Sequence, residues 1–339
     1  MISFFFTSFF YKQMLINKDT VNLYDHPEGR KIHDKKILKV GGIGIIFSFF
    51  LVLFAYRIFN GEYIFLINSI QIELGFSLFF LIAGGLVDDF IGLNASRKLF
   101  FQLISIGILL YSGISLPLID NYVINSIVNI IIYILIINSM NLIDGIDGLS
   151  CGIFIILSGA ILYISSIYLI IDAKYYIVIS IFIGTVVAFF RQNSPPATIF
   201  LGDVGSQLFG WIAAVSIFYL SSIYTYNYQK IYLLSFLSIP LYDVLFVMLV
   251  RFYNYKGNII DKFSRVVKSD QNHIHHIIIK NEKLKKYALT ILLSLFFCFT
   301  MISLIPILYD KYYRLVFYSI LFSYILIRLN LKSKLTIDE

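Results

Sequence analysis

Long apolar runs alternate with short polar segments along the whole chain. A membrane-crossing helix needs about 20 predominantly apolar residues, with a range of roughly 17 to 25. The pattern predicts about 11 spans, at 1–16, 40–56, 72–88, 99–116, 123–139, 149–171, 175–190, 206–224, 231–251, 287–308 and 312–329. The largest polar connections, 17–39 and 252–286, hold no separate soluble domain. We therefore expect an all-α polytopic membrane protein with one integral membrane domain over residues 1–339.

The composition agrees with a membrane protein. Hydrophobic residues make up 59% of the chain and charged residues 14%, against about 25% charged residues in soluble domains. Met1 to Ile16 has no basic region and no small-residue cleavage site, so we expect a short first span and not a cleaved signal peptide. Cys151 and Cys298 both lie in apolar runs, which favours small core residues over a disulfide or metal pair.

The distribution of Lys and Arg predicts an orientation in the membrane. Of the 27 basic residues, 21 fall in one set of alternating connections and the C-terminal tail, five fall in the opposite set, and Lys12 lies in the first span. Positive charge accumulates in cytoplasmic loops. We therefore expect a periplasmic N-terminus and a cytoplasmic C-terminus.

Acidic residues gather at three junctions between spans and loops. Asp88 and Asp89 follow Gly84-Gly85, and Asp203 stands between Gly202 and Gly205. In the third, Asn141, Asp144 and Asp147 are spaced by three residues within Asn138–Leu149, so a helical continuation would place them on roughly one face. Ionisable residues at membrane depth are functional candidates, although polar turns and helix caps are the alternative reading.

Two further polar segments carry basic or histidine side chains. Arg30, Lys31 and His33 suit an anionic partner, either a phosphate or lipid headgroups. His273, His275 and His276 could bind phosphate when protonated or a transition metal when neutral. Their spacing is poor for zinc, and the oxygen-rich ligands elsewhere indicate Mg²⁺.

All five polar segments fall on the predicted cytoplasmic side. Carboxylates, histidines and basic loops together suit phosphoryl transfer with a divalent ion, where positioning and charge neutralisation do most of the work. The chain has no Gly-x-x-x-x-Gly-Lys-Ser/Thr loop, which excludes a P-loop NTPase.

In this order, the motifs resemble the polyprenyl-phosphate N-acetylhexosamine-1-phosphate transferases, glycosyltransferase family 4. The resemblance covers about residues 25–276. It rests on Arg30-Lys31-x-His33 with Gly41-Gly42, Asp88-Asp89 with Lys98, Asn138-x-x-Asn141-x-x-Asp144-Gly-x-Asp147-Gly-Leu149, Phe200-x-Gly202-Asp203-x-Gly205-Ser206, and His273-x-His275-His276. The His-x-His-His motif is similar to the branch that starts O-antigen, common-antigen or teichoic-acid chains.

The resemblance implies transfer of N-acetylhexosamine-1-phosphate, first of all GlcNAc-1-phosphate, from a UDP-sugar to undecaprenyl phosphate, with release of UMP. It implies an enzyme of the bacterial inner membrane that works in the lipid bilayer, with its active site on the cytoplasmic face and no nucleic-acid partner; a homodimer and a covalent intermediate both stay open. Asp203 and Asn141 would hold Mg²⁺, which Mn²⁺ could replace. Asp88, with Asp89 beside it, would be the base or positioner for the lipid phosphate, and Asp144 and Asp147 would shape the nucleotide and metal site. The implied substrate-binding residues are Arg30, Lys31, His33, Lys98, Asn138, Asn193, His273, His275 and His276.

Two departures from the family pattern bear on the sugar. Leu38 stands where the family often has proline, and residues 258–268 lack the usual Ser-Pro-Phe. The alternatives are another UDP-N-acetyl sugar, either a 6-deoxy sugar or phospho-MurNAc-pentapeptide. From other classes, a secondary transporter and an inactive scaffold stay open; the acids lie on one face and not at mid-bilayer, which disfavours the transporter.

Overall fold

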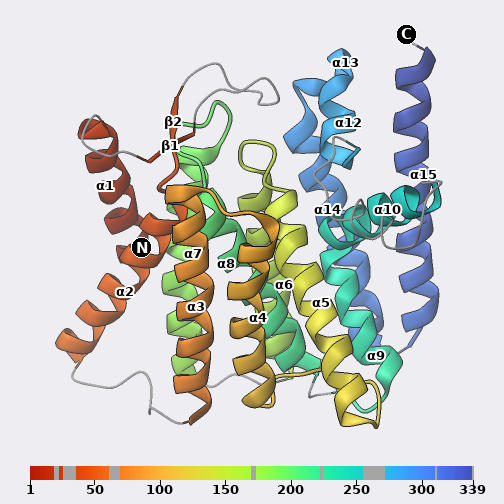
Figure 1. Cartoon of the computed structure of the whole chain (residues 1–339), viewed down its shortest axis with the longest axis horizontal. Helices are drawn as coiled ribbons and strands as arrows, with labels where there is room; N and C mark the ends of the chain where they lie inside the picture. The colour runs from red at the N-terminus through yellow and green to blue at the C-terminus, as the bar shows by residue number, and fades with distance from the viewer. Residues whose placement is uncertain are drawn as a thin grey trace.

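The computed structural model describes residues 1–18, 23–25, 36–60, 69–168, 173–221, 224–254, 272–309 and 311–337. Each predicted span overlaps a helix within these residues (Figure 1). The helices are α1 (Ile2–Ile16), α2 (Gly41–Asn60), α3 (Ser69–Ile91), α4 (Ala95–Tyr111), α5 (Tyr122–Leu142), α6 (Leu149–Ile167), α7 (Ala173–Asn193), α8 (Gly202–Leu220), α9 (Asn227–Tyr232), the 3-10 helix η3 (Leu233–Leu237), α10 (Ser238–Asn254), α12 (Ile274–Lys280), α13 (Glu282–Lys285), α14 (Ala288–Tyr309) and α15 (Tyr313–Ile337).

Within the described ranges, nine helical segments are long and apolar enough to cross a membrane. The segment 227–254 joins α9, η3 and α10 into one of these. Two of the eleven predicted spans are shorter helices, since α1 has 15 residues and α4 has 17. The multi-pass prediction is confirmed, and its orientation in the membrane stays a prediction.

A short β-ladder departs from the all-α expectation. Strand β1 (Tyr24–Asp25) pairs antiparallel with β2 (Ile37–Leu38), and Leu38 also forms a parallel bridge to Ile199. The ladder continues into the first turn of α2, where the Gly41 N–H donates to the Phe200 carbonyl at 2.9 Å. These bonds fix the entry of α2 beside the entry of α8.

Helix α8 forms the centre of the bundle and contacts α2, α3, α5 and α6. Seventy-two per cent of an 18-residue apolar stretch of α8 is buried, the highest fraction among the nine candidate spans of the described residues. Glycine allows the close approach, because a Cβ on Gly42 would lie 2.4 Å from the Gly205 nitrogen, and one on Gly85 would lie 2.8 Å from the Val204 Cα. The start of α8 is therefore wedged between α2 and α3.

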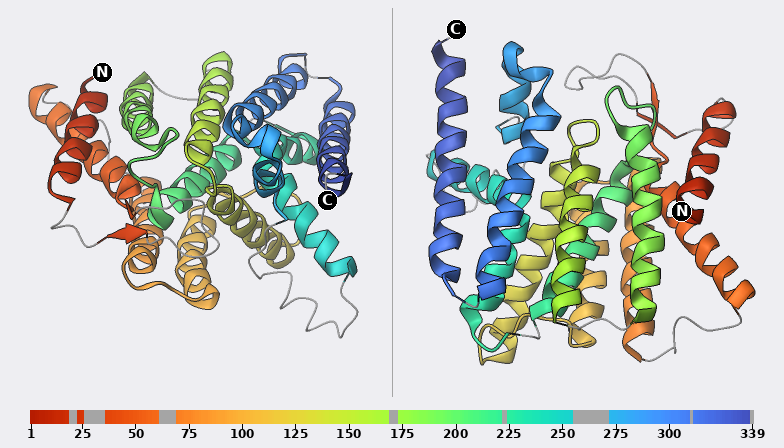
Figure 2. Two further views of the ribbon diagram at one scale, coloured as in Figure 1. Left: turned by 90° about the horizontal axis from the view of Figure 1, so that it is seen from above. Right: turned by 180° about the vertical axis from the view of Figure 1, so that it is seen from behind.

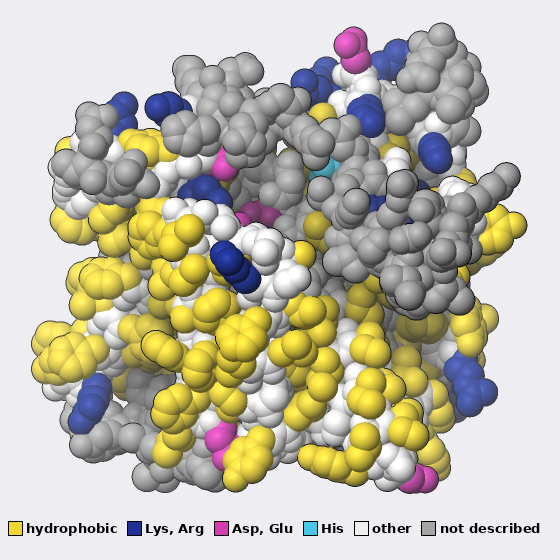
Figure 3. All heavy atoms as spheres, in the orientation of Figure 1, with side chains coloured by type: hydrophobic (Ala, Val, Ile, Leu, Met, Phe, Trp, Pro, Cys, Tyr) yellow, Lys and Arg dark blue, Asp and Glu magenta, His cyan; other side chains and the backbone are white. Residues whose placement is uncertain are grey.

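The polar turns meet at one end of the bundle. The turns between α3 and α4, α5 and α6, and α7 and α8 lie at the same end as α12 and α13 (Figures 1 and 2). Hydrophobic side chains cover the middle of the face in Figure 3, and charged side chains line a hollow near its upper end. The polar segments that are far apart in sequence are thus gathered at one end.

Candidate active site

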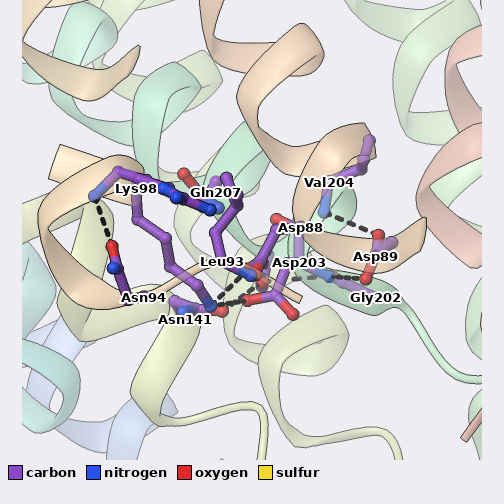
Figure 4. Close-up of polar contacts among 12 residues, drawn as sticks. Asp88, Asp89, Leu93, Asn94, Lys98, Asn141, Gly202, Asp203, Val204 and Gln207 are labelled. Carbon is purple, nitrogen blue, oxygen red and sulfur yellow. Dashed lines mark hydrogen bonds and ion pairs between the residues drawn. The ribbon is translucent and has the colours of Figure 1, made fainter. Parts of the chain in front are cut away.

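Three carboxylates and two lysines form a compact cluster where α3, α4 and α8 meet, and Figure 4 shows the carboxylates with Lys98. Asp88 and Asp89 come from the end of α3, Asp203 from the first turn of α8, and Lys98 from the first turn of α4. Lys98 Nζ lies 3.0 Å from Asp203 Oδ1 and also contacts Asp88 Oδ2. Lys39 Nζ lies 3.0 Å from Asp89 Oδ1 and 3.7 Å from Asp203 Oδ2. Asp203 therefore lies between two ammonium groups.

Asp89 holds the N-terminus of α8. Its Oδ1 accepts a hydrogen bond from the Asp203 N–H at 2.9 Å, and its Oδ2 accepts one from the Val204 N–H at 3.1 Å. A helix N-terminus presents unpaired N–H groups that favour a carboxylate. Gly202 has φ +77°, and a Cβ there would lie 2.7 Å from Asp89 Oδ2, so this capping contact requires glycine.

Asp88 and Asp203 differ in their access to solvent. The Asp88 Oδ1 accepts a hydrogen bond from the Leu93 N–H at 2.7 Å in the turn after α3, and its side chain is 4% exposed. The Asp203 side chain is 21% exposed and Lys98 is 27% exposed. Asp203 and the two lysines are therefore the members of the cluster that a ligand can reach most easily, since Lys39 is 20% exposed and Asp89 only 1%.

Burial and neighbouring charge shift the pKa values of groups beside the cluster. Burial raises the pKa of Asp144 well above its usual value, and the charges of Asp203 and Asp89 raise it further. Burial alone would lower the pKa of Lys39, but Asp89 and Asp203 outweigh it and raise this pKa. The site thus combines a permanently charged lysine with an aspartate that holds its proton more readily than an exposed one.

A row of uncharged polar side chains continues from the acid cluster into the bundle. The Ser206 hydroxyl donates to Asn141 Oδ1 at 2.6 Å and also contacts the Asp203 carbonyl at 3.3 Å. Asn138 Nδ2 donates to Gln102 Oε1 at 3.0 Å, and Gln102 Nε2 donates to Gln207 Oε1 at 3.2 Å. Asn141 is therefore linked to Asp203 through one hydroxyl, while Asn138 is bonded to other carboxamides.

Asp147 and Asn193 join the 143–148 turn to the 194–201 segment. Asp147 Oδ2 accepts from the Ala197 N–H at 2.9 Å. Asn193 Oδ1 accepts from the Gly148 N–H at 2.9 Å, and its Nδ2 donates to the Ile199 carbonyl at 3.0 Å. Both side chains act as loop anchors in this structure; their predicted catalytic and substrate-binding roles stay predictions.

The histidine cluster packs against the same 143–148 turn. A Cβ on Gly145 would lie 2.6 Å from His275 Nε2. The His273 and His275 rings stack 5.7 Å apart, and His275 and His276 lie 4.2 Å apart. Burial lowers the pKa of His275 to about 3, and His276 lowers it too. His275 is therefore neutral at pH 7, which favours uncharged contacts with a ligand over cationic ones.

The structure adds residues that the motifs did not single out. Lys39 is one basic residue among several in its loop, and Gln207 lies outside the motifs. Asp243 is outside the motifs as well, although a carboxylate within an apolar run is itself a signal of function. The predicted substrate residues Arg30, Lys31 and His33, and the segment 258–268, lie outside the described residues.

The oxygen donors of Asp203 and Asn141 suit Mg²⁺. No group of three His, Cys, Asp or Glu side chains in the described part of the chain has metal-binding geometry. Mg²⁺ does not need such a group, because it is usually held by one or two carboxylates, water and substrate phosphates. The accessible Asp203 carboxylate is a donor of that kind, and Asn141 is tied to the same residue through the Ser206 hydroxyl, which contacts the Asp203 backbone carbonyl.

The sequence comparisons agree with this geometry. The model of Glycosyl transferase family 4 matches residues 72–221, which carry every acidic residue of the cluster. The chain is 30% identical over 244 residues to the phospho-N-acetylmuramoyl-pentapeptide-transferase of Borreliella burgdorferi, covering 61% of this chain and 67% of that protein. The chain belongs to glycosyl transferase family 4.

Two other relatives in this family cover more of the chain. The probable undecaprenyl-phosphate N-acetylglucosaminyl 1-phosphate transferase of Bacillus subtilis is 26% identical over 276 residues, 76% of this chain and 69% of that protein. The undecaprenyl-phosphate alpha-N-acetylglucosaminyl 1-phosphate transferase of Thermotoga maritima is 27% identical over 322 residues, 94% of this chain and 91% of that protein. The predicted family is confirmed, and the chain is a membrane enzyme of the glycosyl-1-phosphate transferase type.

Proposed function

We propose that this protein transfers N-acetylglucosamine-1-phosphate from UDP-N-acetylglucosamine to undecaprenyl phosphate and releases UMP. An oxygen of the lipid phosphate attacks the sugar-bearing phosphorus of the UDP-sugar. The bond from that phosphorus to the bridging oxygen breaks, and UMP leaves with this oxygen. The observation that carries the proposal is the pairing of an accessible Asp203 with Lys98 and Lys39 at the polar end of the bundle.

The two lysines would make the site attractive to phosphates despite its carboxylates. A phosphate monoester carries about −1.5 to −2 charge at pH 7, so the acceptor is already ionised and needs positioning more than deprotonation. Lys98 and Lys39 would supply the positive charge. Asp88, nearly buried and paired with Lys98, would aim this ammonium group, and Asp144 would face the nucleotide or its leaving phosphate.

Mg²⁺ would be held by Asp203 and Asn141, where it neutralises charge on the diphosphate. The histidine cluster, which packs against the 143–148 turn, would contact the sugar or phosphate of the donor. We place the active site at the cytoplasmic face of a bacterial inner membrane, because the basic loops lie on that side of the predicted topology. The product would start a cell-surface polysaccharide.

A second candidate donor is UDP-N-acetylmuramoyl-pentapeptide, from which the phospho-N-acetylmuramoyl-pentapeptide group would be transferred. It is favoured by the Borreliella burgdorferi relative, whose name carries that activity. We favour N-acetylglucosamine because the relatives with that activity in their names cover more of the chain, up to 94%.

A donor panel tests the proposal. Purified protein in lipid nanodiscs with Mg²⁺ is given UDP-GlcNAc, UDP-GalNAc, a 6-deoxy UDP-N-acetyl sugar or the UDP-MurNAc-pentapeptide, each with and without undecaprenyl phosphate. We expect UMP release from UDP-GlcNAc only when the lipid is present. Release from another donor would change the sugar, and no release from any donor would overturn the function.

A further inference from the structure

Asp243 is a buried carboxylate on α10 with partners from two other parts of the chain. It is 1% exposed. Its Oδ1 accepts hydrogen bonds from the Ile274 N–H at 3.0 Å and from the Tyr324 hydroxyl at 2.7 Å, and it pairs with Arg328 Nη1. Its Oδ2 lies 2.7 Å from His273 Nδ1. One carboxylate therefore joins α10, the start of the histidine segment and α15.

Helix α15 contacts the Asp243 carboxylate through Tyr324 and Arg328. Arg328 is 4% exposed, donates to the Tyr324 hydroxyl at 2.9 Å and also donates to the Asn272 carbonyl. Its guanidinium lies 4.5 Å from the centre of the Phe246 ring, a cation–π contact. Tyr324 and Arg328 are one helical turn apart, so both reach the same carboxylate from one face of α15.

The Asp243 contact sets how the His273 ring is presented. A carboxylate paired with arginine stays ionised and can only accept hydrogen bonds. His273 Nδ1 therefore carries the proton of this hydrogen bond, and Nε2 is left for another partner. The His273 ring stacks on His275 with 9° between their planes, and His275 lies against Gly145 in the turn that carries Asp144 and Asp147.

We propose that Asp243 is a positioning residue that fixes the tautomer and orientation of His273, and that α15 secures Asp243 through Tyr324 and Arg328. This inference rests on the proposed function, in which the histidine cluster contacts the donor sugar or phosphate. The contact has the form known from metal sites, where the ligating histidine is commonly oriented by a carboxylate on its other ring nitrogen. The C-terminal helix, outside the family match at 72–221, thereby supports a substrate-binding histidine without touching the substrate.

A double-mutant cycle separates positioning from stability. Asp243→Asn keeps the size of the side chain and is expected to lower kcat/KM about 10- to 100-fold, the usual effect of removing such a partner. In a His273→Gln background the same change should have almost no further effect on kcat/KM, because the residue it acts through is gone. Full multiplication of the two losses would overturn the proposal, since a purely structural carboxylate would act in either background.

Two tyrosines provide a milder matched pair. Tyr324→Phe deletes the hydroxyl that donates to Asp243, and we expect kcat/KM to fall about 2- to 10-fold, as for one lost hydrogen bond. Tyr242 is also buried, packs on Tyr324 with ring centres 6.1 Å apart, and its hydroxyl has no hydrogen-bond partner among the described residues. Tyr242→Phe should leave kcat/KM unchanged. Equal losses in both variants would contradict the role given to α15.

Nitrogen NMR of histidine-labelled protein tests the contact without any activity. The chain has five histidines, so the His273 signal can be assigned by its loss in His273→Gln. Asp243→Asn should shift the His273 Nδ1 signal in the absence of substrate; an unchanged signal would refute the positioning contact. If wild-type protein shows the contact but releases no UMP with any donor, the proposed function fails while the positioning contact stands.

Discussion

Asp88 and Asp89 are adjacent carboxylates with different contacts: Asp89 caps α8 and Asp88 pairs with Lys98. The same substitution, Asp to Asn, made at each position distinguishes the two roles. Asp89→Asn keeps one acceptor for the N-terminus of α8 but turns an N–H₂ group toward the other backbone N–H. It also removes the ion pair with Lys39. Leaving a buried N–H unsatisfied costs about 1–3 kcal/mol, so we expect a total loss of roughly 3 kcal/mol.

Asp88→Asn is the matched control because its backbone contact survives. An asparagine carbonyl can still accept from the Leu93 N–H, and Lys98 keeps Asp203 as a partner. The partly exposed ion pair that is lost contributes about 0–1 kcal/mol. Asp88→Asn should therefore leave stability nearly unchanged, yet lower sugar-phosphate transfer more than 10-fold, because Lys98 is no longer aimed by two carboxylates.

Thermal unfolding in nanodiscs, followed by intrinsic fluorescence, measures the difference. At about 2 °C per kcal/mol, Asp89→Asn should lower Tm by roughly 6 °C and Asp88→Asn by about 2 °C or less. If Asp88→Asn lowered Tm as much as Asp89→Asn does, the assignment of α8 capping to Asp89 would be wrong.

Three further predictions concern other parts of the site. Asp203→Ala should abolish UMP release, a loss of at least about 100-fold; an active variant would remove the metal assignment. Gly145→Ala should lower transfer because its Cβ would meet His275 Nε2 at 2.6 Å, whereas Gly159→Ala, with nothing within 4 Å, should not; equal activities would contradict the packing of the histidine cluster. The His275 pKa of about 3 lies below the unfolded value of about 6.5, so the unfolded state binds more protons between these values. Stability should therefore fall by about 2 kcal/mol from pH 7 to pH 5, and His275→Gln should flatten this slope in pH-dependent unfolding curves.

The helices and the acidic motifs could be predicted because both depend on residues that are neighbours in the sequence. Apolar runs of membrane length mark helices without reference to their neighbours, and Asp88, Asp144 and Asp203 stand out against such runs. The apolar pattern predicts the start of this span at 206, because Gly202 and Asp203 read as loop, whereas α8 begins at Gly202. They are helical because Asp89, 114 residues earlier, caps the helix from α3, and no local signal carries that information.

Contacts between distant segments account for the other omissions. Lys39 reaches Asp89 and Asp203 because the ladder through Leu38 fixes the chain just before α2. Asp243 and Arg328 meet across 85 residues. Periodicity and motif spacing describe neighbours along one element, so they could not predict pairs that depend on how helices pack.

An experimental structure with UDP-N-acetylglucosamine and Mn²⁺ in place of Mg²⁺ tests the central claim most directly, since the anomalous signal of Mn²⁺ locates the ion. We predict one Mn²⁺ peak bound by Asp203 and Asn141, with the diphosphate between Lys98 and the histidine cluster. A nucleotide and metal bound elsewhere, with the Asp203 cluster still closed on its two lysines, would contradict a single active centre at this end of the bundle.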